Sequence, residues 1–156
     1  MTLASDSPIE GHAVHRDRML EHARKMLAEG DRLQASEKIW GTAVHGIKVI
    51  ADERGWPYSR HQDAGVITSY IAEQTGQLEI DTLFSAIRDM HTNFYGDRRT
   101  LKEIGVAIER AEQFLSLLHE AHLAMPPDLP MPNHPEYRKR VRQDARRAAE
   151  ARSGNC

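Results

Sequence analysis

The sequence contains nine histidines, so metal binding is the first chemistry to consider. His119 and His122 are three residues apart, as are His12 and His15, and on a helix each pair can supply two ligands to one ion. A zinc site, however, needs three or four ligands. The single cysteine is the last residue, Cys156, and the His-Glu-x-x-His pattern of metalloproteases is absent. We therefore predict no metal site and no cofactor, and interpret these histidines as solvated residues near helix ends.

A second group of candidate residues occupies the segment 35–48 with the spacing of a helix. Glu37, Trp40, His45 and Lys48 lie on neighbouring turns of that helix. A partly buried histidine near a tryptophan ring and a carboxylate can act as a base or form a pocket in which a nucleobase stacks. The alternative is a histidine at the edge of the core whose ring bonds to a backbone carbonyl.

A third group, Arg88, His91 and Tyr95, shares one surface of a later helix. Arginine and histidine together can stabilise the charge of a phosphate, so these residues are the catalytic candidates. The alternative is a polar cluster at a helix end that tethers the following loop. A single small-molecule pocket requires that the candidate ligand-binding residues of both groups converge in the fold. They are Glu37, Trp40, His45, Lys48, His91 and Tyr95.

The elements that must position these side chains are helices. Apolar residues recur at spacings of three and four and predict five helices, at about 14–29, 31–55, 63–74, 78–95 and 100–122. Asp31 and Thr100 each precede a Gln or Glu by three residues, the pattern of a capped helix N-terminus. Small residues at Gly41, Ala43 and Gly46 should let another helix come close. Since no strand pattern competes and the connections are short, the predicted fold class is all-α, an antiparallel up-and-down bundle of four to five helices.

The chain divides into three parts by composition. We expect a flexible N-terminus at 1–13, the helical bundle at 14–122, and a Pro-rich linker with a basic tail at 123–156. Five of the seven prolines lie between Pro126 and Pro135, which favours an extended linker. The tail beyond it has a helical composition but few apolar residues, so a solvated helix and a disordered segment both remain open. An RNA-tethering arm is one interpretation of its arginines and a solvated tail is the other.

Charge and composition narrow the class of protein. Residues from Leu123 onward carry seven Lys or Arg against four Asp or Glu, whereas the preceding residues carry 14 against 19, a net charge of −5. An acidic body does not indicate a nucleic-acid surface, in contrast to the tail. One cysteine, a polar N-terminus and no apolar run of about 18 residues predict a cytoplasmic protein without a membrane span.

Three sequence blocks indicate a family resemblance. They are Glu37-Lys-Ile-Trp-Gly41, Arg54-Gly-Trp-Pro57 and His91-Thr-Asn-Phe-Tyr95, in this order. With them, residues from about Asp17 to His122 resemble an archaeal repeat-type family of the HEPN group (higher eukaryotes and prokaryotes nucleotide-binding). The resemblance implies an antiparallel bundle, often a homodimer, and a role near nucleotide or RNA biology. Some HEPN proteins are metal-independent ribonucleases, and others are partners of nucleotidyltransferases.

The ribonuclease branch of the HEPN group has an arginine five to seven residues before a histidine. In that mechanism the RNA 2′-hydroxyl attacks the adjacent phosphate while the histidine moves protons and the arginine holds charge. His91 is the positional counterpart of that histidine, but the residues five to seven before it are Phe84, Ser85 and Ala86, and Arg88 is too near. The required spacing does occur in Arg16–His22 and Arg54–His61, which is no more than nine histidines produce by chance.

We therefore expect a non-catalytic HEPN-like module that forms a homodimer and binds a protein partner or a nucleotide or RNA ligand. The alternative is a metal-independent endoribonuclease that uses His91 with Arg88, or His61 with Arg54.

Overall fold

The structure is a computed structural model that describes residues 8–58, 62–131 and 135–154. These residues form six α-helices and no strand. The helices are α1 (Pro8–Ala28), α2 (Arg32–Arg54), α3 (Asp63–Thr75), α4 (Glu79–Gly96), α5 (Leu101–Ala124) and α6 (Pro135–Gly154). Within the described ranges, no helix is both long enough and apolar enough to cross a membrane.

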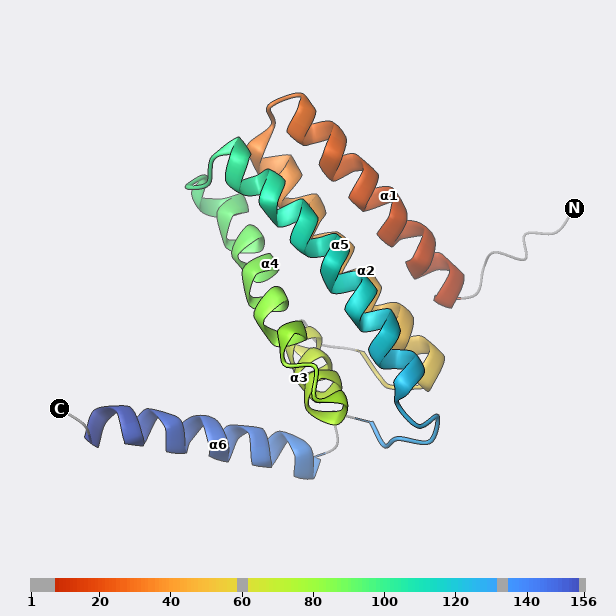
Figure 1. The fold of residues 1–156 in the computed structure, drawn as a ribbon, viewed down its shortest axis with the longest axis vertical. Coiled ribbons are helices and arrows are strands. Elements are labelled where there is room, and N and C mark those ends of the chain that lie inside the picture. Colours follow the sequence, from red (N-terminus) through yellow and green to blue (C-terminus); the bar gives the residue numbers. More distant parts are fainter. Residues whose placement is uncertain (1–7, 59–61, 132–134, 155–156) are drawn as a thin grey trace, which may run out of the picture.

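The four long helices α1, α2, α4 and α5 alternate in direction, and the short helix α3 lies at one end of them (Figure 1). Helix α2 packs against all four of α1, α3, α4 and α5. Helices α4 and α5 pack against each other and close the bundle, and α6 lies beyond the end at which α3 is found (Figure 1). The prediction of an all-helical antiparallel bundle is therefore confirmed in its coarse form.

The helix ends follow the capping residues of the sequence. The Asp31 carboxylate accepts a hydrogen bond from the Gln34 backbone N–H at 3.1 Å, and Thr100 and Glu103 form a reciprocal capping box. Gly55 ends α2 at a φ of 69°, a left-handed conformation that glycine adopts without a steric penalty. One boundary was wrong: α1 begins at Pro8 rather than near residue 14, so residues 8–13 of the expected flexible N-terminus are helical.

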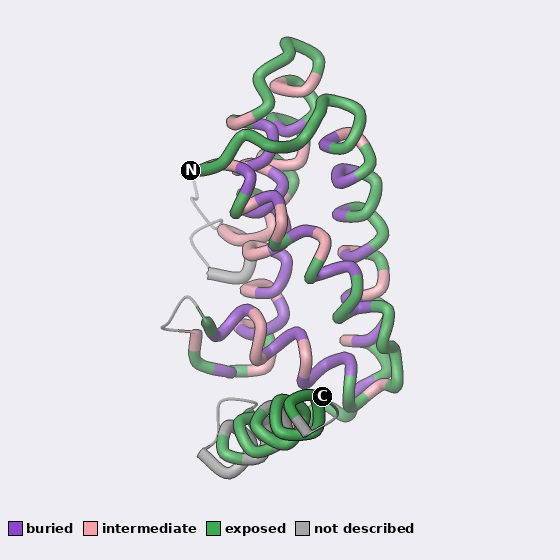
Figure 2. Tube along the Cα trace, turned by 90° about the vertical axis from the view of Figure 1, so that its left-hand side faces the viewer, coloured by how far each residue is buried: buried purple, intermediate pink, exposed green. Residues whose placement is uncertain are grey.

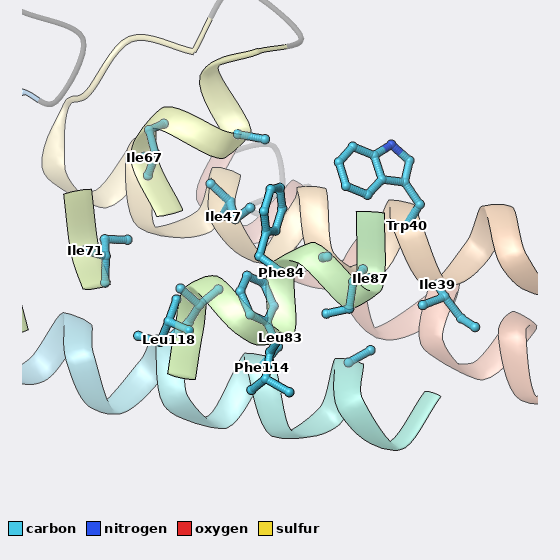
Figure 3. Close-up of a cluster of buried hydrophobic side chains, with 14 of the residues drawn as sticks. Ile39, Trp40, Ile47, Ile67, Ile71, Leu83, Phe84, Ile87, Phe114 and Leu118 are labelled. Carbon is cyan, nitrogen blue, oxygen red and sulfur yellow. The ribbon is translucent and has the colours of Figure 1, made fainter. Parts of the chain in front are cut away.

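The core is formed mainly by α2, α3, α4 and α5, whose inward faces are buried along their lengths (Figure 2). Among the described side chains of α1, only Ala23 is buried, so α1 covers the bundle without filling its centre. Figure 3 shows Ile67 and Ile71 of α3 facing residues of α2, α4 and α5. Large aliphatic and aromatic side chains at this junction supply most of the buried apolar area that stabilises the fold.

Small residues on α2 allow the close approach that the sequence predicted. A Cβ placed on Gly41 would lie 2.2 Å from Met19 Sδ of α1, and one placed on Gly46 would lie 2.5 Å from Leu115 Cδ2 of α5. Both distances are far below van der Waals contact, so a side chain from each neighbour occupies the space that a larger residue would fill. Ala43 between them is fully buried.

The Pro-rich segment after α5 is anchored to the bundle. Arg54 donates to the carbonyls of His122, Met125 and Pro126 at distances of 2.7–3.2 Å. Farther along, the Trp56 indole N–H donates to the Leu129 carbonyl, and the Tyr70 hydroxyl donates to the Pro130 carbonyl. Residues 125–131 form no helix, as expected, but side chains from α2, α3 and the loop between them fix their path.

The residues of the basic tail form α6. Every side chain of α6 whose burial is described is exposed (Figure 2). A helix with this composition has almost no apolar surface to bury, which explains why it adds nothing to the core.

Asn93 joins the end of α4 to α2 and to the following turn. Its side chain is buried, and its Nδ2 donates to Ser36 Oγ at 2.9 Å. Its Oδ1 accepts the backbone N–H groups of Arg98 and Arg99 at 2.7 and 2.9 Å. One side chain makes all three bonds, so its loss would leave two partly buried backbone donors and the buried Ser36 hydroxyl without these partners.

We predict that Asn93→Ala lowers the free energy of unfolding by about 3 kcal/mol, because buried groups left without hydrogen bonds cost roughly 1–3 kcal/mol each. Urea denaturation followed by circular dichroism measures the change. The control is Thr92→Ala at the adjacent exposed position, where we expect a change within about 0.5 kcal/mol. An Asn93→Ala variant as stable as the control would contradict this role.

Candidate functional site

Four of the predicted ligand-binding residues meet between α2 and α4. We call Glu37, Trp40, His91 and Tyr95 the Trp40–His91 cluster. The rings of Trp40 and His91 are stacked, with centroids 5.1 Å apart and an interplanar angle of 27°. His91 Nδ1 lies 3.6 Å from Glu37 Oε2, and the Tyr95 ring meets the His91 ring edge-on at 5.7 Å.

The Trp40–His91 cluster runs from the core to the surface. Trp40 is only 6% exposed and its ring centroid lies 5.7 Å from that of Phe84, at the border of the core (Figure 3). His91 and Glu37 are partly exposed, whereas Tyr95 is 77% exposed. The buried tryptophan thus fixes the imidazole, and the tyrosine extends the aromatic surface into solvent. Such an arrangement suits stacking of a flat ligand on the exposed ring.

Arg88 makes its recorded contacts on the other side of Phe84. Its guanidinium lies over the Phe84 ring, with Cζ 4.8 Å from the centroid, a cation–π geometry. Its terminal nitrogen also lies 2.6 Å from where a Cβ on Gly65 of α3 would be. These contacts hold the Arg88 side chain against α3. Arg88 lies three residues before His91 in the sequence.

The other two predicted residues lie elsewhere on α2. His45 faces α1, where its Nδ1 is 2.9 Å from Nδ1 of His12 and its ring is 5.3 Å from that of His15. Lys48 Nζ lies 4.9 Å from the centroid of the Tyr58 ring. The six predicted residues therefore do not share their contacts: four form the Trp40–His91 cluster, and His45 belongs to a second group, the His12–His45 cluster, with His12, His15 and Asp52.

Burial favours the neutral form of the His12 and His45 rings. A hydrogen bond between two Nδ1 atoms needs one proton, so one ring donates and the other accepts. Burial lowers the pKa of His45 to about 4, assisted by the nearby His12, Lys48 and His15. Burial also lowers the pKa of His12, against the opposing effect of Asp52, whose Oδ2 lies 3.5 Å from His12 Nε2. At neutral pH both rings are uncharged.

Of the alternative catalytic pair Arg54–His61, the structure describes Arg54. His61 lies outside the described residues. Arg54 donates through Nε to His122 Nδ1 at 2.9 Å, in addition to its three backbone carbonyls, and its guanidinium lies 5.4 Å from the Trp56 ring. The Glu53 carboxylate also makes a close hydrogen bond with His122 Nε2. Arg54 thus connects the C-terminal ends of α2 and α5, and four of its five N–H donors are already used.

One feature beside the Trp40–His91 cluster was not predicted from the sequence. A hollow of about 360 Å³ adjoins Tyr95, and we call it the Tyr95 hollow. Its lining residues are Asp89, Thr92, Asn93, Tyr95, Gly96, Arg98 and Arg99. Both arginines are exposed, and Asn93 fixes their backbone N–H groups. Arg99 also forms ion pairs with Asp89 and Glu103 at 2.8 and 3.0 Å. The available signal was the Arg98-Arg99 pair three residues after Tyr95.

Metal binding has little support in the described part of the chain. No group of three or more His, Cys, Asp or Glu side chains there is arranged to hold an ion. His12 and His15, one of the two pairs considered from spacing, meet His45, and the other pair includes His122, which binds Glu53 and Arg54.

Comparison with known proteins gives one match. The model of a family described as the archaeal PaREP1/PaREP8 family matches residues 13–115. No curated protein and no solved structure matches the chain. The matched range contains α2, α3 and α4 completely, most of α1 and α5, and every residue of the Trp40–His91 cluster.

The lowered pKa of His45 predicts that stability falls on acidification. In the unfolded chain this histidine takes up a proton near pH 6.5, whereas in the fold it does so only near pH 4. Between these values the unfolded state binds more protons, so the free energy of unfolding decreases as the pH falls. His45→Gln removes the titration, and between pH 7 and 5 it should lose about 1 kcal/mol less than the wild type, after allowance for solvent screening. Thermal denaturation at both pH values measures the difference.

The control is His22→Gln, at an exposed position on α1, which should follow the wild-type pH dependence. If the His45→Gln variant loses as much stability as the wild type on acidification, His45 is not held neutral by the fold.

Proposed function

Because this chain belongs to the archaeal PaREP1/PaREP8 family, we propose that it is a non-catalytic HEPN-like module that forms a homodimer and binds a nucleotide or RNA. The resemblance of its three sequence blocks to the HEPN group supplies the expectation of dimerisation and of a nucleotide-type ligand. The geometry of the Trp40–His91 cluster supports the location of that ligand.

The observation that carries the proposal is the aromatic series from Trp40 through His91 to Tyr95. Its buried end is fixed by packing, and its outer end is a 77% exposed tyrosine ring. An exposed aromatic ring of this kind provides a stacking surface for any nucleobase, worth about 1–3 kcal/mol per base. A large exposed aromatic side chain held in one orientation binds with a smaller entropic cost than a mobile one.

The Tyr95 hollow supplies the polar half of the same site. Its volume of about 360 Å³ is within the range of small-ligand pockets. Arg98 and Arg99 line it, and we place the phosphate of a base stacked on Tyr95 against them. Asn93 holds the turn that carries these arginines, so the Asn of the third sequence block positions the candidate phosphate contacts.

The absence of catalysis is proposed from the positions of Arg88 and Arg54, the arginines that the sequence analysis paired with a histidine. Metal-independent RNA cleavage needs an arginine that holds charge beside the histidine that moves protons. Arg88 lies over Phe84 and against Gly65, and Arg54 is committed to the end of α5. His91 instead faces Glu37 and Trp40, contacts that orient a ring for binding.

Dimerisation has a candidate surface on the α1–α2–α5 side. A groove of about 230 Å³ lies there, and its apolar lining includes Val49, Leu115, Leu118 and the 72% exposed Leu123, with the polar Arg16, Glu53, His119 and His122 also lining it. An exposed large apolar side chain next to an apolar groove is typical of a surface that another protein covers.

We predict that Tyr95→Ala weakens binding of a short labelled RNA by about tenfold, because one base loses its stacking partner. Fluorescence anisotropy in EDTA measures the affinity, and gel analysis of the same samples detects cleavage. Leu78→Ala is the matched control, since Leu78 is also large and 69% exposed but lies at the opposite end of α4. Equal affinities of the Tyr95→Ala and wild-type proteins would overturn the site, and cleavage that disappears in His91→Ala would establish the ribonuclease instead.

We also predict that the purified protein has twice the mass of one chain in solution at tens of micromolar. Size-exclusion chromatography with light scattering measures it. Leu123→Glu should shift the equilibrium toward the monomer, because a charge in an apolar interface is costly. A wild-type protein that is strictly monomeric at this concentration would exclude the homodimer.

A further inference from the structure

Helix α6 separates the charge of this protein into two parts. Its 20 residues contain seven Lys or Arg and three Asp or Glu, a net charge of +4, whereas residues 1–134 carry 14 against 20, a net charge of −6. The cationic side chains of α6 whose burial is described are all exposed, namely Lys139, Arg142, Arg146, Arg147 and Arg152. The positive charge therefore lies on a surface that the bundle does not cover (Figure 2).

The linker before α6 is held against the bundle as far as Pro130. Arg54, Trp56 and Tyr70 hold the carbonyls of the preceding linker from His122 to Pro130, and α6 begins at Pro135. Two of these three side chains come from the Arg54-Gly-Trp-Pro57 block within the family match, whereas the linker and α6 lie beyond it.

A lipid surface is a poor partner for α6. Helices that lie on membranes bury large apolar residues such as Leu, Phe and Trp. Helix α6 contains none of these and has one tyrosine, one valine and four alanines. Without a substantial apolar face, only its charge is available for binding.

The acidic surface of a second copy is a weaker partner than a polyanion. Carboxylates of the bundle already form ion pairs within the chain: Asp97 with Arg32, Asp89 and Glu103 with Arg99, and Glu112 with Arg24. These ion pairs occupy carboxylates of the bundle, so fewer carboxylates are available to bind α6 of a second copy. A nucleic-acid backbone presents one unneutralised charge per phosphate and releases counterions when cations bind it.

We propose that α6 binds the sugar–phosphate backbone of a nucleic acid. This inference rests on the proposed function for its ligand class, but it assigns a separate set of residues and a separate kind of contact. The Tyr95 site, at the end of α4 away from α3, takes a base and its phosphate, and α6, beyond the α3 end of the bundle, takes the phosphates of a separate part of the strand (Figure 1). A helix of 20 residues is about 30 Å long, enough to follow several nucleotides.

The test compares two triple variants of the full chain with the same loss of charge. One is Arg142→Gln, Arg146→Gln and Arg152→Gln on α6, and the control is Arg18→Gln, Lys25→Gln and Arg110→Gln at exposed positions on α1 and α5. Binding of a labelled 20-nucleotide RNA is measured by anisotropy from 50 to 300 mM KCl, and binding of a labelled mononucleotide is measured in parallel. A duplex DNA of the same length and vesicles containing anionic lipid are the comparison ligands.

We expect the α6 variant to bind the RNA about tenfold or more weakly at 50 mM KCl. The slope of log affinity against log salt should fall by about 2, because each phosphate contact on a single strand contributes about 0.7. The control variant should change affinity no more than about twofold, and the mononucleotide affinity should be the same in all three proteins. Binding of the duplex with the same α6 dependence would identify the shared phosphate contact as the determinant.

Equal losses in the two triple variants would overturn the proposal, since the general charge of the protein and not α6 would then be responsible. So would wild-type binding to the vesicles but not to RNA, or an α6 variant that changes only self-association. If the α6 dependence holds but Tyr95→Ala binds as the wild type does, the arm stands and the proposed Tyr95 site fails. If Tyr95→Ala weakens binding but the α6 variant binds as the wild type does, the proposal for α6 fails and the Tyr95 site stands.

Discussion

The fold depends on helix α2 packing against four other helices at once. Ten of its residues are buried, and together they cover one continuous half of the helix surface. With side chains of ordinary size on α2, the axes of its neighbours would lie about 8–10 Å from its own axis. Here Gly41 receives Met19 of α1, Gly46 receives Leu115 of α5, and the larger Ile39 and Ile47 fill the space toward α4 and α3. The arrangement of the candidate site follows from this, because two edges of the same central helix supply Trp40 and His45 to different neighbours.

The three sequence blocks on which the family resemblance rests contain residues with defined structural roles. Trp40 in the first block packs on Phe84, Arg54 and Trp56 in the second hold the linker, and Asn93 in the third joins α4 to α2. Only His91 and Tyr95 retain contacts that a ligand could share, and they adjoin residues that set the frame. A family pattern in a helical bundle therefore marks its joints as much as its binding surface, and the two are separated only when the contacts are known.

Most of the fold could be predicted because local patterns determine it. Capping at Asp31 and Thr100, helix ends at Gly55 and Gly76, and regular apolar spacing placed five helices to within a few residues. The early start of α1 was missed because residues 8–13 have little apolar periodicity. The grouping of site residues could not be predicted in full. Whether His45, five residues after Trp40, turns toward α1 or α4 depends on how far each neighbour is rotated about its axis, a quantity set by packing between distant segments. The pairing of His45 with His12 is such a long-range contact.

The anchored linker also limits how this protein can change in length. Surface connections usually tolerate insertions and deletions, since closing a slightly longer loop costs little. Here Arg54, Trp56 and Tyr70 bind the carbonyls of Pro126, Leu129 and Pro130, so the number of residues between successive anchors is set by the spacing of three fixed donors. One added or missing residue would displace at least one carbonyl from its donor. Sequence drift in this segment should thus be restricted to substitutions, with its length held constant by side chains some 60 to 70 positions earlier in the chain.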